Sequence, residues 1–130
     1  TGAMYRAVAY KSIREHIGRD DKKAIVNIAR KIDISIKKPH KIFLDGEDVS
    51  RKIRLPGVSA LVSKIAAIEG VRKAMVKRQH SIAEKGSIII EGRDIGTVVF
   101  PSADIKFFLL ANAEQRAKRR YKELQGKKIN

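Results

Sequence analysis

The segment Ile90-Glu-Gly-Arg-Asp-Ile-Gly96 joins anion-binding and polar side chains to two glycines. Arg93 provides a bidentate donor for a phosphate or carboxylate, and Asp94 provides an acceptor for an amino or hydroxyl group. The apolar run of residues 87–90 predicts a buried strand, and parallel α/β sheets bind ligands beyond the carboxyl ends of such strands. The segment is therefore a candidate ligand site. On this motif alone, a structural ion pair between Arg93 and Asp94 that closes a turn is the stronger alternative.

Further basic side chains recur at spacings that could serve a phosphorylated ligand. Arg116 and Arg120 are four residues apart, so a helix places them on one face, where they could converge on a polyphosphate. A solvated charged face is the usual alternative for such a run. Tyr5-Arg6 near the start and Arg72 farther along are similarly ambiguous until a fold places them beside the other candidates.

Several kinds of chemistry are excluded by residue type and spacing. The chain has no cysteine, so it has no disulfide, thiolate metal site or cysteine nucleophile. His16, His40 and His80 are too far apart in sequence for a local metal-binding pair, and we expect each at the surface. No Gly-x-Ser-x-Gly nucleophile motif occurs, and no Gly-x-x-x-x-Gly-Lys-[Ser/Thr] phosphate loop occurs among these residues.

Composition limits the class of protein and its partners. The 130 residues carry a formal net charge of +15, and 43% are hydrophobic, enough for a packed core. No apolar stretch is long enough to cross a membrane and no secretory signal is visible, so we expect a soluble protein of the cytoplasm. The charge favours an anionic partner: nucleic acid, an anionic membrane face, or a small phosphorylated ligand.

The first half of the chain alternates helical and strand-like patterns. Apolar residues at helical spacing predict a helix over residues 22–32, which Asp20 or Asp21 can cap. Period-two patterning over residues 32–36 and the run of residues 41–44 predict two strands. Asp45-Gly46 then predicts a hairpin turn.

The second half predicts two helices, two buried strands and a basic helix. Helical spacing extends over residues 58–68, Gly70 is expected to break that helix, and residues 71–84 follow as another. The apolar runs of residues 87–90 and 105–110 resemble strands of a parallel α/β sheet. Asn112, with Gln115 three residues later, predicts the capped start of the basic helix.

Five segments in this order resemble the bacterial cytidylate kinase family, the nucleoside monophosphate kinases that act on CMP and dCMP. They are Thr1-Gly-Ala-Met-Tyr-Arg-Ala-Val-Ala, Leu44-Asp-Gly-Glu-Asp-Val-Ser50 with Ile53-Arg54, Val71-Arg-Lys-Ala-Met-Val-Lys-Arg-Gln79, Glu91-Gly-Arg-Asp-Ile-Gly-Thr-Val-Val-Phe-Pro101 and Ala113-Glu-Gln-Arg-Ala-Lys-Arg-Arg120. The resemblance covers nearly the whole chain.

The resemblance implies an α/β fold: a P-loop kinase core, with a parallel sheet flanked by helices, and a monophosphate-binding insert that contains a small antiparallel sheet. Its expected divisions are core helices over 1–31, the insert over 32–70, a core helix and parallel strands over 71–112, and the start of the lid over 113–130.

The resemblance also assigns roles to individual residues. The CMP-binding set that it implies is Thr1, Tyr5, Arg6, Ser63, Arg72, Arg93 and Asp94. Within that set Thr1 and Arg6 contact the monophosphate, and Ser63 and Asp94 contact cytosine or sugar edges. The implied catalytic set is Arg93, Asp94, Arg116 and Arg120, of which Arg116 and Arg120 reach the phosphates of ATP from the lid.

The implied reaction is transfer of the γ-phosphoryl group of ATP to CMP or dCMP, with ATP and Mg²⁺ as cofactors, no metal-ligating residue in this chain, and a monomer as the expected state. The chain begins inside the first matching segment and stops inside the lid, so we expect a central fragment that lacks the phosphate loop and is inactive alone. Two alternatives are a small basic nucleic-acid-binding module and a catalytically dead regulatory or interaction fragment. Scarce aromatic residues, 5% of the chain, argue against the first.

Overall fold

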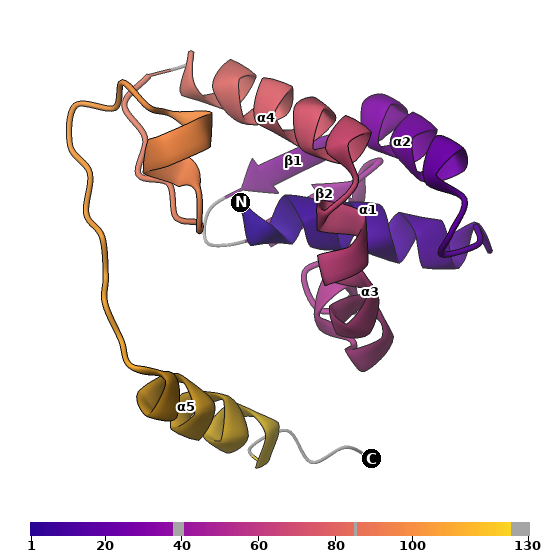
Figure 1. Ribbon diagram of the computed structural model, residues 1–130. Helices are drawn as coiled ribbons and strands as arrows, with labels where there is room; N and C mark the ends of the chain where they lie inside the picture. Colours follow the sequence, from indigo (N-terminus) through magenta and orange to yellow (C-terminus); the bar gives the residue numbers. More distant parts are fainter. Residues whose placement is uncertain (38–40, 85, 126–130) are drawn as a thin grey trace.

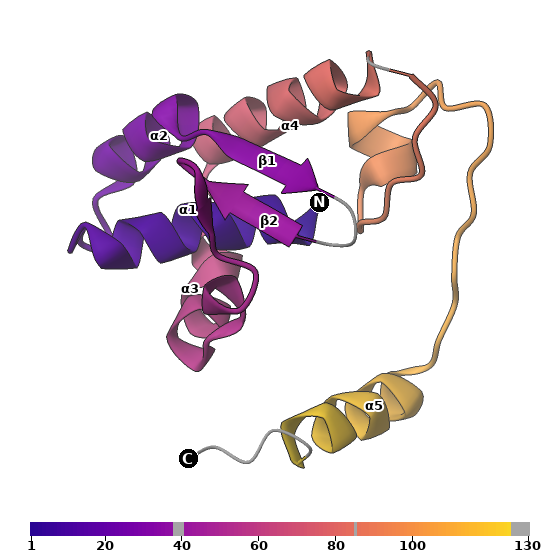
Figure 2. The same cartoon turned by 180° about the vertical axis from the view of Figure 1, so that it is seen from behind.

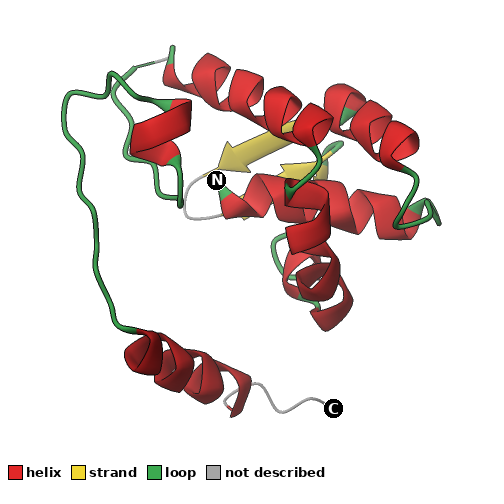
Figure 3. Cartoon of the chain, in the orientation of Figure 1, coloured by secondary structure: helices red, strands yellow, loops and turns green. Residues whose placement is uncertain are grey.

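A computed structural model describes residues 1–37, 41–84 and 86–125 (Figure 1). Most of the regular structure along these residues is helical (Figure 3). The elements in order are α1 (Gly2–Arg14), α2 (Lys22–Lys31), β1 (Ile34–Lys37), β2 (Lys41–Leu44), β3 (Glu47–Asp48), the 3₁₀ turn η1 (Lys52–Arg54), α3 (Pro56–Ala66), α4 (Glu69–Ala83), the π-helical turn η2 (Ile95–Val99) and α5 (Ala113–Gln125).

Helix α1 forms the centre of the folded body. Its consecutive residues Ala7, Val8 and Ala9 are all fully buried, so neighbours surround the middle of the helix. These neighbours are α2, α3 and the turn η1. Two of the three buried side chains are alanines, which allow the packed elements to approach closely.

Helix α2 forms where the sequence predicts it. Ile25, Ile28 and Ala29 are buried on one face, as their spacing requires. The carboxylate of Asp21 accepts a hydrogen bond of 3.0 Å from the Ala24 amide, which identifies it as the N-cap. Asp20, the other cap candidate, instead forms an ion pair with Lys64 of α3.

The sheet is antiparallel, with strand order β1-β2-β3, and it lies in front of the helices when the molecule is seen from behind (Figure 2). Leu44 pairs with Glu47 across a two-residue turn. Both turn residues, Asp45 and Gly46, have positive φ angles, 49° and 82°. Asp-Gly favours this backbone in tight hairpins, so the hairpin prediction is confirmed.

The prediction that Gly70 breaks a helix is wrong. Helix α3 ends at Ala66, and Gly70 lies inside the first turn of α4. A Cβ atom at Gly70 would lie 2.7 Å from Cγ2 of Val26 in α2. The glycine therefore lies where α2 and α4 approach closely. The break between α3 and α4 falls at Ala67 and Ile68 instead.

The two predicted buried strands are not strands in this structure. Residues 87–90 and 105–110 have no strand assignment, and side chains such as Ile89 and Phe107 are exposed. A strand requires a neighbour to receive its backbone hydrogen bonds, and among the described residues no other strand lies beside either run. The described sheet is antiparallel, and the predicted parallel sheet is not formed.

Helix α5 lies apart from the folded body, at the end of a long extended segment (Figure 1). Oδ1 of Asn112 accepts a hydrogen bond of 2.8 Å from the Gln115 amide, so the predicted cap is confirmed. The described side chains of the helix are exposed.

Candidate functional site

Arg72 of α4 and Asp94 of the loop before η2 form an ion pair, in which Nη2 of Arg72 donates to Oδ2 of Asp94. The hydrogen bond to Asp94 and the charge of this carboxylate raise the pKa of Arg72. The sequence alternative, an ion pair between Arg93 and Asp94, is wrong because Asp94 pairs with Arg72. Arg93 is exposed and forms no ion pair with any described residue.

Tyr5 of α1 lies within electrostatic reach of this pair. Burial raises the pKa of the Tyr5 hydroxyl, while Arg72 acts to lower it and Asp94 to raise it. The hydroxyl therefore stays protonated at neutral pH and can both donate and accept a hydrogen bond. A half-buried tyrosine thus lies near enough to the two charged groups for both to influence its pKa.

Thr1 ties the loop that carries Asp94 to the start of α1. Its Oγ1 atom donates a hydrogen bond of 2.9 Å to the carbonyl oxygen of Glu91. A Cβ atom at Gly92 would lie 2.5 Å from that same Oγ1. Any larger residue at this position would have to displace the side chains of Thr1 and Ile95, which gives a reason for one of the two glycines in the segment.

Arg6, the residue after Tyr5 in α1, is held against η1 and α3. Its Nη1 atom donates to Oγ of Ser59 at 2.8 Å and to the carbonyl oxygen of Ile53 at 3.3 Å. The guanidinium group is half-buried, and within the described part of the chain no carboxylate pairs with it. Its Nε and Nη2 donors make no hydrogen bond to the described residues, so they can bind an anion.

The remaining predicted residues are more exposed. Ser63 lies on α3, one turn after Ser59, with an exposed side chain. Arg116 and Arg120 lie on α5, and Figure 1 shows α5 apart from α4. Arg120 pairs with Glu123 at 3.2 Å. The structure thus brings Thr1, Tyr5, Arg72 and Asp94 together and leaves the α5 arginines apart.

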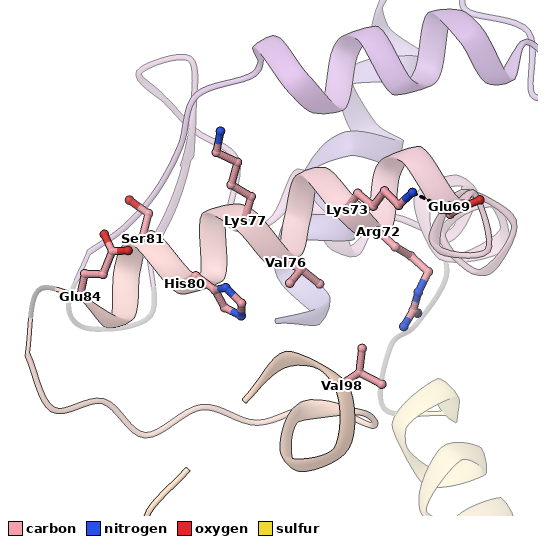
Figure 4. A pocket seen from close by; sticks show the side chains of 9 residues that line it. All are labelled: Glu69, Arg72, Lys73, Val76, Lys77, His80, Ser81, Glu84 and Val98. Carbon is pink, nitrogen blue, oxygen red and sulfur yellow. Dashed lines mark ion pairs between the residues drawn. The ribbon is translucent and has the colours of Figure 1, made fainter. Parts of the chain in front are cut away.

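A cleft of about 690 Å³ lies between α4 and the turn η2 (Figure 4). Arg72, Val76 and His80 point from α4 toward this turn, and Val98 faces them. Nε2 of His80 lies 2.6 Å from the Val99 carbonyl oxygen. The turn is therefore fastened to α4 twice, through Arg72 and Asp94 at one end and through His80 at the other.

Sequence analysis missed two residues that support the site. His80 has an exposed side chain, as predicted, yet it also contacts Val99 and packs against Phe100, with ring centroids 5.1 Å apart and the rings tilted by 49°. His80 follows Arg72 by eight residues and therefore shares its helix face, and this spacing could have indicated that both contact the same segment. Ser59 has a similar signal, since it precedes Ser63 by one turn.

Neither a metal centre nor a membrane span is found in the part of the chain that the structure describes. No group of three or more histidine, aspartate or glutamate side chains there could hold a metal ion. No helix of residues 1–37, 41–84 and 86–125 is both long and apolar enough to span a bilayer.

Comparison with known proteins places these residues in one family. The family model described as cytidylate kinase matches residues 1–130. The chain is 53% identical over 127 residues to a cytidylate kinase of Caldanaerobacter subterraneus subsp. tengcongensis. The matched region covers 98% of this chain and 56% of that protein. It is 48% identical over 133 residues to a cytidylate kinase of Limosilactobacillus reuteri, and this match covers 100% of this chain and 58% of that protein.

A cytidylate kinase of Clostridioides difficile is 48% identical over 130 residues, covering 100% of this chain and 60% of that protein. The chain thus spans somewhat more than half the length of the curated relatives it matches. Identity near one half extends over nearly the whole length of this chain. The chain belongs to the cytidylate kinase family.

Proposed function

We propose that the protein is an ATP-dependent kinase of CMP and dCMP, and that the residues described above bind the monophosphate. Family membership supports this activity, because the matching relatives carry the name cytidylate kinase. The observation that carries the proposal is Arg6, a half-buried cation with three N–H donors unused among the described residues. A partly buried cation without a carboxylate favours an anionic ligand.

The base end of the ligand would lie at Arg72 and Asp94. The Asp94 carboxylate can accept a hydrogen bond from the exocyclic amino group of cytosine, and Arg72 can donate to the ring acceptors. Ser63 would add an adaptable hydroxyl from α3, and Tyr5 a ring beside the pair. AMP presents a different donor and acceptor pattern, so this arrangement would favour cytosine.

The transfer step needs charge neutralisation more than a nucleophilic side chain. In-line phosphoryl transfer develops charge on the transferring oxygens, which positioned arginines stabilise. We assign Arg116 and Arg120 to the phosphates of ATP, with α5 moving toward the ligand as a lid, and Arg93 to the reacting phosphates. ATP and Mg²⁺ would be the cofactors; among the described residues no group of three or more histidine, aspartate or glutamate side chains could hold the ion.

The proposal includes a finer view of the fold. Residues 87–90 and 105–110 would become strands of a parallel core when neighbouring strands pair with them, since their exposed apolar side chains suit burial on both faces. Residues 1–31 and 71–112 would belong to this core, 32–70 to the monophosphate-binding insert, and 113–130 to the lid. We further propose a cytoplasmic monomer with no stable nucleic-acid partner.

Isothermal titration of the purified chain with CMP, cytidine and AMP tests the proposal. We expect saturable binding, with a higher affinity for CMP than for cytidine or AMP. The Arg6→Gln variant should bind CMP no more tightly than cytidine. Equal affinity for CMP and AMP would contradict it. Because the 130 residues contain no phosphate loop, we expect no phosphoryl transfer by them alone. Polynucleotide binding that falls steeply with salt, without CMP binding, would favour the nucleic-acid alternative.

A further inference from the structure

The hydroxyl of Ser59 accepts a hydrogen bond from Arg6, and none of the roles proposed above involves Ser59. We propose that Ser59 is a positioning residue, which fixes the Arg6 guanidinium so that its free donors meet the phosphate of the ligand. This inference rests on the proposed function, because it needs Arg6 to bind that phosphate.

The geometry fixes the guanidinium through one nitrogen. The two N–H groups of Nη1 are directed to two acceptors, Oγ of Ser59 at 2.8 Å and the Ile53 carbonyl oxygen at 3.3 Å. A planar group held at these two points cannot rotate freely, so Nε and Nη2 keep a constant direction. The Ser59 bond is the shorter of the two, and its cationic donor makes it stronger than a bond between neutral groups.

The surroundings of Ser59 make it a firm support. Ile53 is 2% exposed, and Val58, beside Ser59 in α3, is also 2% exposed, so both segments are anchored in the core. Arg6 itself is carried by α1, which packs against both η1 and α3. An arginine otherwise has many rotamers, and holding one of them in advance removes part of the entropy cost of binding.

Helix α3 would then serve both ends of the ligand. Ser59 and Ser63 are four residues apart and share one helix face. Ser63 would contact the base directly, whereas Ser59 would act on the phosphate only through Arg6. Ser59 therefore should affect phosphorylated ligands and leave the unphosphorylated nucleoside unaffected, which separates positioning from a general effect on the fold.

The test compares Ser59→Ala and Ser59→Thr with the native chain. Titration calorimetry should show CMP affinity reduced about tenfold in Ser59→Ala, the size expected for losing a hydrogen bond to a charged group. Cytidine affinity should not change, and Ser59→Thr, which keeps the hydroxyl, should retain most of the CMP affinity. Ser102→Ala removes an exposed serine hydroxyl outside the site and serves as the matched control.

A second measurement does not depend on the ligand. NMR relaxation of the Arg6 side-chain ¹⁵Nε should show an ordered group in the native chain and a more mobile one in Ser59→Ala. Equal losses of CMP and cytidine affinity, or an unchanged Arg6 relaxation, would overturn the positioning role. If the native chain binds no CMP, the proposed function fails with it; if the native chain binds CMP and Ser59→Ala binds it equally well, this inference alone fails.

Discussion

The ion pair between Arg72 and Asp94 should contribute to ligand binding far more than to stability. Replacing Asp94 by Asn removes the charge and keeps the shape, and replacing Arg72 by Gln removes the other partner. The two side chains are 40% and 33% exposed, so water screens their attraction. Pairs with such exposure contribute about 0.2–1 kcal/mol to the free energy of unfolding, which sets the size of the expected loss.

The expected effect on CMP binding is larger. Asp94→Asn removes the negative charge and replaces one of the two acceptor oxygens by an NH₂ donor, so the remaining carbonyl oxygen cannot serve both Arg72 and the exocyclic amino group of cytosine as the carboxylate can. It also releases the Arg72 guanidinium, whose direction depends on Asp94. Losing a charged hydrogen bond costs about 1.5–3 kcal/mol, or about ten- to a hundredfold in affinity.

Urea unfolding of both single variants and of the double variant gives the coupling energy of the pair, and titration with CMP gives the effect on binding. Glu15→Gln is the matched control, since it removes a carboxylate that lies 3.1 Å from Lys11 in an ion pair outside the site. A coupling energy of about 3 kcal/mol together with unchanged CMP affinity would refute the reasoning, because those values would describe a buried structural ion pair.

Three further predictions concern the fold that positions the site. Gly70→Ala should lower the free energy of unfolding by about 1–3 kcal/mol, because the new Cβ would overlap Val26, and a Val26→Ala change should relieve most of the loss in urea titrations. Asp21→Ala should remove the α2 cap and cost about 1 kcal/mol, whereas an equally large loss in Asp20→Ala would contradict that assignment. Burial acts to raise the pKa of Asp45, yet hydrogen bonds from Lys11 and the Asp33 amide keep that pKa below its ordinary value. The stabilisation from Asp45 should therefore be complete above about pH 4 and be lost as the pH falls further; a native chain and an Asp45→Asn variant that lose stability equally in acid would exclude it.

Local signals account for the parts of the fold that the sequence predicts well. The N-cap at Asp21 and the turn at Asp45 and Gly46 depend on residues within a few positions of one another. The runs of residues 87–90 and 105–110 do not form the predicted strands in this structure, because an apolar run becomes a strand only when a neighbour pairs with it, and no neighbour does so among the described residues. Gly70 was misjudged for a related reason, since the close approach of Val26 comes from another helix.

In the candidate site, too, the contacts that could not be predicted join residues far apart in the sequence. Arg93 adjoins Asp94 in sequence, yet the carboxylate pairs with Arg72, which lies 22 positions earlier. The resemblance to the family identified both residues, but it did not indicate that they touch. Ser59 was missed because its hydroxyl gains significance only from Arg6, 53 positions away in the sequence.

Three residues at the start of α1 connect the parts of the site. Thr1 bonds to the loop that carries Asp94, Tyr5 lies within electrostatic reach of the pair formed by Arg72 and Asp94, and Arg6 reaches η1 and α3. These contacts come from a single helix whose middle is fully buried, so α1 cannot shift for one contact without disturbing the others. The relative positions of the proposed phosphate-binding and base-binding groups are therefore set by the packing of α1. This packing would keep a fixed spacing between the two ends of the proposed site, although its residues come from separate segments of the chain.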